Sequence, residues 1–203
     1  IAWEIRTKEE AIAAGRDRSG IAQSELWPDT IIEVNPDNEV VWEWRSWDHL
    51  SSKKGGRANG KAVSKDITDP GKININFGGK NADWLHFNGI DYNEALDQIT
   101  VSSRPFGEFF VVDHSTANYD NPAGGIAEAA GPAGDLLYRW GNPAAYASGS
   151  EEDQMEFGLH DIQWIHSGLE GEGNFLIFNN GNVRPGEKYS SIDEVIPPID
   201  ANG

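Results

Sequence analysis

The sequence predicts an all-β fold, a β-propeller of four-stranded antiparallel blades, of which this chain holds an incomplete portion with long inserted loops. Its 203 residues include 23 glycines and 10 prolines and are only 38% hydrophobic, which indicates many turns between short elements. Eight tryptophans recur near the ends of strand-like runs, as is typical of stacked sheets. An internal repeat of four strands is the third observation, because such units repeated along a chain are the signature of propeller blades.

The first part of the chain predicts a lead-in and then a hairpin. Within residues 1–28, apolar positions at helical spacing predict a short, charged helix that ends at Gly15. Residues 29–203 are assigned to the propeller-like domain, which we expect to be part of a larger propeller. It begins with a hairpin whose strands are residues 30–34 and 39–44.

The rest of the domain alternates loops with strands. The polar, glycine-rich stretch at about residues 51–80 predicts a long inserted loop, and a second connection is expected from Ser115 to Gly134. Residues 196–203 resemble the beginning of another crossover. The predicted strands between these segments are residues 85–92, 98–103, 108–113, 135–140, 159–165, 174–179 and 190–195.

The repeat is marked by two Leu-His pairs, at His86 and His160. "LHFNGIDYNEALDQITVSS" and "LHDIQWIHSGLEGEGNFLIFNN" each contain Leu-His, a strand, a turn and a second strand. "TIIEVNPDNEVVWEW" and "FFVVDHS…GDLLYRW" share the other half, a strand followed by one that ends in Trp. Alternating the halves gives four-stranded blades, of which the chain supplies about two to two and a half. Both histidines would then open an innermost strand and face the central channel near one end.

Composition excludes several classes of function. The net charge of −17 argues against nucleic acid and anionic membranes as partners, and an anion site would need a local cluster of Arg and His. The absence of cysteine excludes disulfides, thiolate metal sites and a cysteine nucleophile. No apolar run is long enough to span a membrane and no signal peptide is visible. Because the first residue is Ile1 and not Met, we expect a processed chain or a piece of a longer one.

Familiar catalytic and ligand-binding motifs are missing. The sequence has no Walker loop, dinucleotide fingerprint, zinc pattern or serine elbow. The acidic turns "NPDNE", "DITDPGKININ" and "GSEEDQ" lack EF-hand spacing. We therefore expect no metal site, and solvated turns explain these acidic runs.

Five runs, in the right order, carry a family resemblance: "DWLHFNGIDYNEALDQITVSSR", "DLLYRWGNPAAY", "FGLHDIQWI", "NFLIFNNGNVRP" and "YSSIDEVIPP". They resemble bacterial and archaeal aryl-sulfate sulfotransferases, β-propeller enzymes that move a sulfuryl group from one phenol to another. The likeness extends from about Asp29 to Pro198. It implies a secreted or periplasmic enzyme that acts on aryl sulfates and phenols without a cofactor.

The resemblance also implies roles for individual residues. His160 matches the histidine nucleophile that carries the sulfuryl group, and His86 and Arg104 match the pair that supports it. His49 is the nearest candidate for a further substrate-binding histidine. The chain departs from the family pattern where Pro105 follows the arginine, and it lacks the additional blades that close the propeller.

Further candidates follow from position. Asn88 points the same way as His86 along its strand, and Trp84 precedes that strand, so both are candidates for contacting substrate. Asp161 or another acceptor is expected to fix the free ring nitrogen of His160.

Purely structural roles for these residues stay open. A histidine in a sheet is more often structural than catalytic, an arginine at a strand end is usually solvated or paired with an acid, and His114 and His166 lack a motif. The alternative functions are a silent extracellular structural module that assembles, for example as a homo-oligomer, through open blade edges, and a module that binds an aromatic or sulfated ligand.

Overall fold

The computed structural model describes residues 1–114 and 134–198 and confirms an all-β fold. Three antiparallel sheets dominate, and none of the described sheets closes on itself. The first contains β1 (Ala2–Trp3), β4 (Asp29–Val34) and β5 (Val40–Arg45). The second contains β10 (Phe87–Asn93), β11 (Gln98–Ser103), β12 (Glu108–Asp113) and β13 (Leu136–Trp140). The third contains β14 (Leu159–Trp164), β15 (Phe175–Asn179) and β16 (Ser191–Val195).

The second sheet is the predicted four-stranded unit. Its strands pair in chain order, each antiparallel to the next, and the first hairpin is also present. The strands expected at residues 98–103 and 108–113 have those bounds, and the other predicted strands shift by one or two residues at an end. The connection predicted from Ser115 to Gly134 lies, except for its last residue, outside the described residues, as does the end of the predicted crossover.

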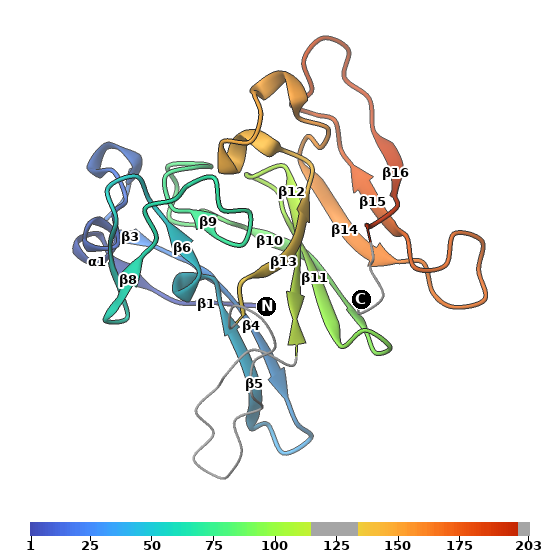
Figure 1. Ribbon diagram of the computed structural model, residues 1–203, viewed down its shortest axis with the longest axis horizontal. Coiled ribbons are helices and arrows are strands. Elements are labelled where there is room, and N and C mark those ends of the chain that lie inside the picture. The colour runs from blue at the N-terminus through green and yellow to red at the C-terminus, as the bar shows by residue number, and fades with distance from the viewer. Residues whose placement is uncertain (115–133, 199–203) are drawn as a thin grey trace.

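The second sheet lies between two layers of the molecule. Strand β12 is buried on both faces: Phe109 and Val111 pack with the third sheet, while Phe110 and Val112 pack with the first sheet and the N-terminal part. Figure 1 shows this sheet between the β4–β5 hairpin and the strands β14 to β16. Burial on both faces explains why residues 109–112, "FFVV", are continuously apolar.

The N-terminal part is helical where the spacing predicts it. Helix α1 (Lys8–Ala13) begins with a capping box between Thr7 and Glu10, and it buries Ala11. The chain turns at Gly15, whose φ of +100° favours glycine. Strand β2 (Arg6–Thr7) pairs with β3 (Glu25–Leu26) in the same part. Because β1 from the lead-in pairs with β4, the two parts share a sheet, and the boundary after residue 28 stays a prediction.

The long inserted loop predicted at about residues 51–80 contains short strands. The segment holds a small hairpin of β7 (Gly56–Ala58) and β8 (Lys61–Val63), and β9 (Ile73–Asn74) pairs in parallel with β6 (Leu50–Ser51). Ala58, Val63, Ile73 and Ile75 are buried in the core. These apolar residues are too sparse to produce a strand period, so only long-range packing identifies them. Short 3₁₀ helices at Arg18–Gly20, Ser46–Asp48, Pro143–Tyr146 and Glu151–Asp153 complete the described elements.

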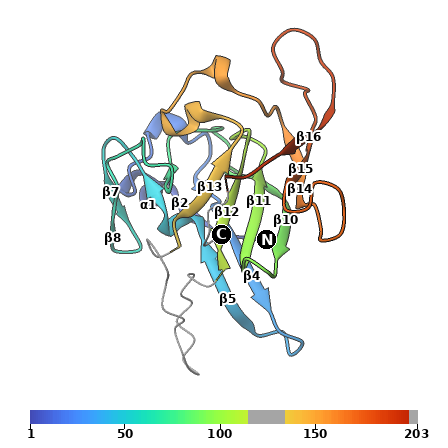
Figure 2. The same ribbon diagram turned by 45° about the vertical axis from the view of Figure 1, so that its right-hand side comes forward.

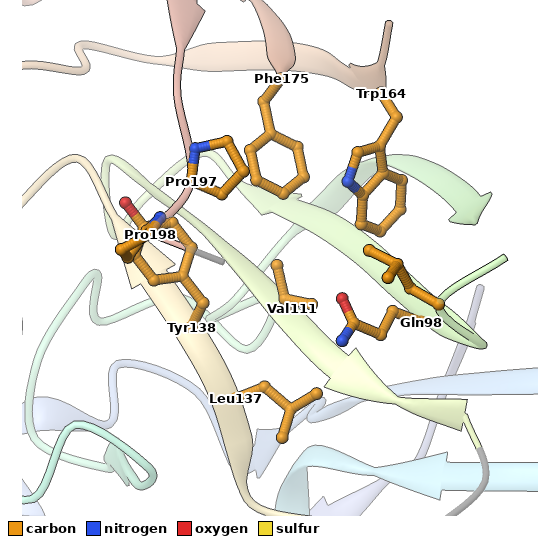
Figure 3. Close-up of a pocket in the computed structure, with 9 residues that line it drawn as sticks. Gln98, Val111, Leu137, Tyr138, Trp164, Phe175, Pro197 and Pro198 are labelled. Atoms are coloured by element: carbon orange, nitrogen blue, oxygen red, sulfur yellow. The ribbon is translucent and has the colours of Figure 1, made fainter. Parts of the chain in front are cut away.

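Aromatic side chains join the second and third sheets. The rings of Phe109 and Phe175 have centroids 4.7 Å apart, and those of Trp164 and Phe175 are 5.0 Å apart. Figure 3 shows Phe175 and Trp164 above Val111 and Tyr138, around a small cavity of about 130 Å³. Trp164 is therefore a packing residue between these two sheets.

Strands β10 and β14 lie side by side and run in the same direction (Figure 2). The Asn88 side chain donates to the Leu159 carbonyl over 3.0 Å at one end, and the Trp164 N–H donates to Asp91 over 2.8 Å at the other. Gly89 permits this approach, because a Cβ there would lie 2.9 Å from the backbone nitrogen of Asp161. The beginnings of the two strands, which carry the conspicuous histidines, thus lie at the same end.

No helix in the described parts of the chain is long and apolar enough to cross a membrane.

Candidate functional site

His160 is the second residue of β14 and is partly exposed. Its Nδ1 lies 3.1 Å from the Gly158 carbonyl oxygen and 2.6 Å from the Asn180 side-chain nitrogen. Nε2 has no hydrogen-bond partner among residues 1–114 and 134–198. When Nδ1 carries the proton it donates to Gly158, and Nε2 then holds an available lone pair.

Both neighbours of the His160 ring are neutral. The Asn180 amide also donates to the Gly158 carbonyl over 2.6 Å, so the three groups form one network. An unprotonated Nδ1 can accept from Asn180 and a protonated Nδ1 can donate to Gly158. The acceptor beside this ring is thus Gly158 and not Asp161, whose φ of +53° belongs to a strand irregularity and whose side chain is exposed.

Arg104 follows the last residue of β11 and is exposed. Its Nε would lie 3.8 Å from a Cβ placed on Gly158, so the second and third sheets bring Arg104 next to the turn that precedes His160. Among the described residues its guanidinium has no hydrogen bond and no ion pair. An unpaired guanidinium in a chain of net charge −17 is a strong candidate for binding an anion.

His86 precedes β10 and has a different environment. Its φ is +48°, a left-handed conformation that is rare for a residue with a side chain. Its Nδ1 contacts the carboxylate of Asp83, and the His86 side chain is 43% exposed. A charged acceptor thus holds this ring, whereas neutral groups hold the ring of His160.

A buried carboxyl group, Asp29, lies behind the His86 pair. Its Oδ1 accepts from the backbone of Phe87 over 3.3 Å and from the Trp3 indole over 3.1 Å. Burial, and secondarily the charge of Asp83, raises the pKa of Asp29 to about 7. This acid therefore remains protonated through much of the acidic range and adds little negative charge to the site there.

A second buried acid, Glu156, lies close to His160 in sequence. It is fully buried, and neither of its carboxyl oxygens has a hydrogen-bond donor among the described residues. Burial, and then the negative charge of Asp193, raises the pKa of Glu156 to about 8. In its protonated form it can donate to Asp193, which also accepts from Asn179 over 3.0 Å.

The remaining predicted site residues have structural contacts. Asn88 donates to Leu159 and accepts from the Ser102 hydroxyl over 2.6 Å, so it links the two histidine-bearing strands. Trp84 is fully buried and donates to the Phe77 carbonyl over 2.6 Å, which makes it a core residue.

His49 is 8% exposed. Its Nδ1 lies 2.9 Å from the Asp135 carboxylate, and its ring stacks on Trp44 with centroids 5.2 Å apart. No described contact links it to His86, Arg104 or His160.

Sequence reasoning missed three residues that shape the site: Asp83, Gly158 and Asn180. An Asp three residues before a His is a usable signal, because a turn can bring the two side chains together. The importance of Gly158 follows from its φ of +78° and from its neighbour Asn182, whose Oδ1 would lie 2.7 Å from an added Cβ. Neither constraint on Gly158 can be recognised from the amino-acid sequence alone.

Two clefts lie away from this site. A cleft of about 460 Å³ between β4, β5 and the β10–β11 hairpin contains Trp42, Tyr92 and His114 at the opposite end of β10. The cavity in Figure 3 lies beside Trp164, at the opposite end of β14 from His160. Among the described residues, no group of three or more His, Asp or Glu side chains is placed to hold a metal ion.

Comparison with known proteins supplies the family. Searches among curated proteins and among solved structures found no match. The model of the arylsulfotransferase (ASST) family matches residues 9–195, which is nearly the whole chain. The match covers every residue of the geometry just described except Trp3. The chain therefore belongs to the arylsulfotransferase family.

Proposed function

We propose that this chain transfers a sulfuryl group from an aryl sulfate to a phenol through a sulfonated His160, without a nucleotide cofactor. One observation carries the proposal: a histidine with a free Nε2, His160, and an unpaired guanidinium, Arg104, both lie beside Gly158. Family membership supports the same substrates.

The first half-reaction forms an N–S bond and breaks an S–O bond. The Nε2 lone pair of His160 attacks sulfur, and the electron pair of the breaking bond moves to the phenol oxygen, which takes a proton from His86. The charges balance, because an anionic ester and a protonated His86 become a neutral phenol, a neutral His86 and a zwitterionic sulfonated ring. The acceptor phenol reverses each step.

The partners of Nδ1 suit a His160 ring that is first sulfonated and then passes on its sulfuryl group. A sulfonated imidazole gives up its Nδ1 proton readily, because the sulfuryl group withdraws electrons. The Gly158 carbonyl accepts from a protonated Nδ1, and the Asn180 amide donates to an unprotonated Nδ1. Both protonation states of this nitrogen therefore have a hydrogen-bond partner.

The other residues act on charge and position. Arg104 would bind the sulfuryl oxygens, for which its planar fork of donors is suited. Asn88 would hold the beginnings of β10 and β14 in register, because it lies on β10 and its side chain bonds to Leu159 on β14 and to Ser102 on β11. Trp84 and His49 would support the fold.

The proposal also covers the complete propeller, the location of the protein and its partners. The three sheets would be successive blades of a β-propeller, completed by further blades or by other copies of the chain, in a secreted or periplasmic protein. Aryl sulfates and phenols, and not nucleic acid, would be its partners.

Intact-mass spectrometry after brief exposure to 4-nitrophenyl sulfate and an alkaline quench tests the proposal. The expected result is a gain of one SO₃ group that peptide mapping places on His160 and that is lost in His160→Ala. The control is His166→Ala, which removes an exposed histidine with no side-chain partner in the described chain and should leave the adduct unchanged. A folded protein that forms no adduct, or an adduct that survives in His160→Ala, would overturn the proposal.

A further inference from the structure

The Asp83–His86 pair differs from an ordinary surface ion pair. Oδ2 of Asp83 contacts Nδ1 of His86, while Oδ1 is buried and has no donor among residues 1–114 and 134–198. The main chain at Asp83 is anchored by its bridge to Trp27, whose N–H donates to the Ala82 carbonyl over 2.7 Å. The carboxylate is thus fixed by the backbone and directed at one ring nitrogen.

The His86 backbone supports the same geometry. A left-handed φ is unfavourable for a residue with a Cβ, so surrounding contacts must hold it. The next residue, Phe87, donates its N–H to Asp29, and the contact with Asp83 holds the ring from the other side. Ring and backbone are therefore fixed together where β10 begins.

We propose that Asp83 is a positioning residue, which keeps a proton on Nδ1 of His86 and so leaves Nε2 as the atom that exchanges a proton with the phenol oxygen. The role in catalysis rests on the proposed function, whereas the position of the proton does not. A carboxylate can only accept, so Nδ1 must donate to it in both the neutral and the charged ring.

Asp29 makes this arrangement compatible with an anionic substrate. Two acidic groups, Asp83 and Asp29, face His86. While Asp29 holds its proton, Asp83 supplies the negative charge that contacts the ring. A charged His86 then balances Asp83, and the pair does not repel a sulfate ester.

Ring-nitrogen NMR of ¹⁵N-labelled protein at a pH where the histidines are neutral tests the assignment directly. His86 should carry its proton on Nδ1, and in Asp83→Asn the proton should move to Nε2, because an amide can donate to Nδ1. The matched control is Asp97→Asn at the other end of the sheet, where Asp97 lies 2.7 Å from Nδ1 of His114. This variant should leave the His86 signals unchanged. A wild-type His86 with its proton on Nε2 overturns the proposal whether or not the protein is an enzyme, and whether or not Asp83→Asn folds.

The rate of His160 sulfonation separates positioning from a merely structural role. With phenyl sulfate, whose phenolate leaves poorly without a proton, Asp83→Asn should slow the reaction about 100-fold. With 4-nitrophenyl sulfate the loss should be below about threefold, because that leaving group needs little protonation. An equal loss with both donors overturns the proton-exchange role. If the wild-type protein forms no adduct with either donor, the proposed function and this role fail together, and the NMR result still decides where Asp83 holds the proton.

Discussion

The two histidines that open β10 and β14 have the same position in the sequence repeat and opposite surroundings in the structure. A carboxylate, Asp83, contacts Nδ1 of His86, whereas a carbonyl and an amide, from Gly158 and Asn180, contact Nδ1 of His160. A carboxylate can only accept, so it fixes a proton on the ring nitrogen that it contacts. A neutral acceptor together with a neutral donor, as at His160, fixes neither proton position. The difference matches a proton carrier on one strand and a nucleophile on the other.

The backbone differs at the same place. His86 itself adopts the left-handed conformation, whereas on β14 the following residue, Asp161, does so. Both strands also shift register here, between Phe87 and Gly89 on β10 and between His160 and Gln163 on β14. Such irregularities re-aim side chains at sheet ends. Repeat-equivalent residues therefore need not present their rings in the same way.

The largest expected effect comes from separating the two strands. Gly89→Val places a side chain where a Cβ alone would lie 2.9 Å from the β14 backbone, so we expect a loss of about 3 kcal/mol in the free energy of unfolding. Urea unfolding measures it. Gly79→Val is the control, since the nearest atom to its Cβ lies 3.9 Å away. Equal losses in the two variants would mean that β10 and β14 do not depend on this close approach.

The buried acids allow a test by pH. Burial raises the pKa of Glu156 to about 8, so between about pH 5 and 8 the folded protein binds a proton that the unfolded chain, with an ordinary carboxyl, has released. Stability from this group is fully present below the unfolded pKa and is lost as pH rises. Glu156→Gln removes the titration. The wild type should therefore lose about 3 kcal/mol relative to the variant from pH 5 to pH 8.

Chemical unfolding of both proteins at several pH values measures this difference. A difference that stays constant with pH would show that Glu156 has an ordinary pKa in the folded protein.

The smallest effect is expected at the turn before His160. Gly158→Ala adds strain at a φ of +78° and a Cβ 2.7 Å from Asn182, which should displace the carbonyl that holds the ring. His160 sulfonation should then slow about tenfold. Gly173→Ala shares the strain, at a φ of +86°, but has no neighbour within 4 Å, so it should leave the rate unchanged. Equal sulfonation rates in the two variants would show that Gly158 does not contribute to the site.

Much of the fold could be predicted because strand signals are local. Runs such as residues 98–103 and 108–113 combine β-branched or aromatic residues with flanking turns, and their observed bounds match. The segment at residues 51–80 could not be predicted in the same way. Its short strands exist because Ala58, Val63 and Ile73 are buried by distant parts of the chain. Intrinsic strand propensity is a weak signal where tertiary contacts determine the backbone conformation.

By itself, the sequence determined the all-β class, the repeat, the family and the identity of His86, Arg104 and His160 as candidates, since these depend on residue types in a fixed order. Only the tertiary structure decided that Arg104 of one sheet lies beside Gly158 of the next. It also decided that Trp84 is buried and that Asn180 lies beside Nδ1 of His160. Residue order specifies which groups are available. The distance and dielectric that set their chemistry arise when separate segments pack, and no local pattern encodes them.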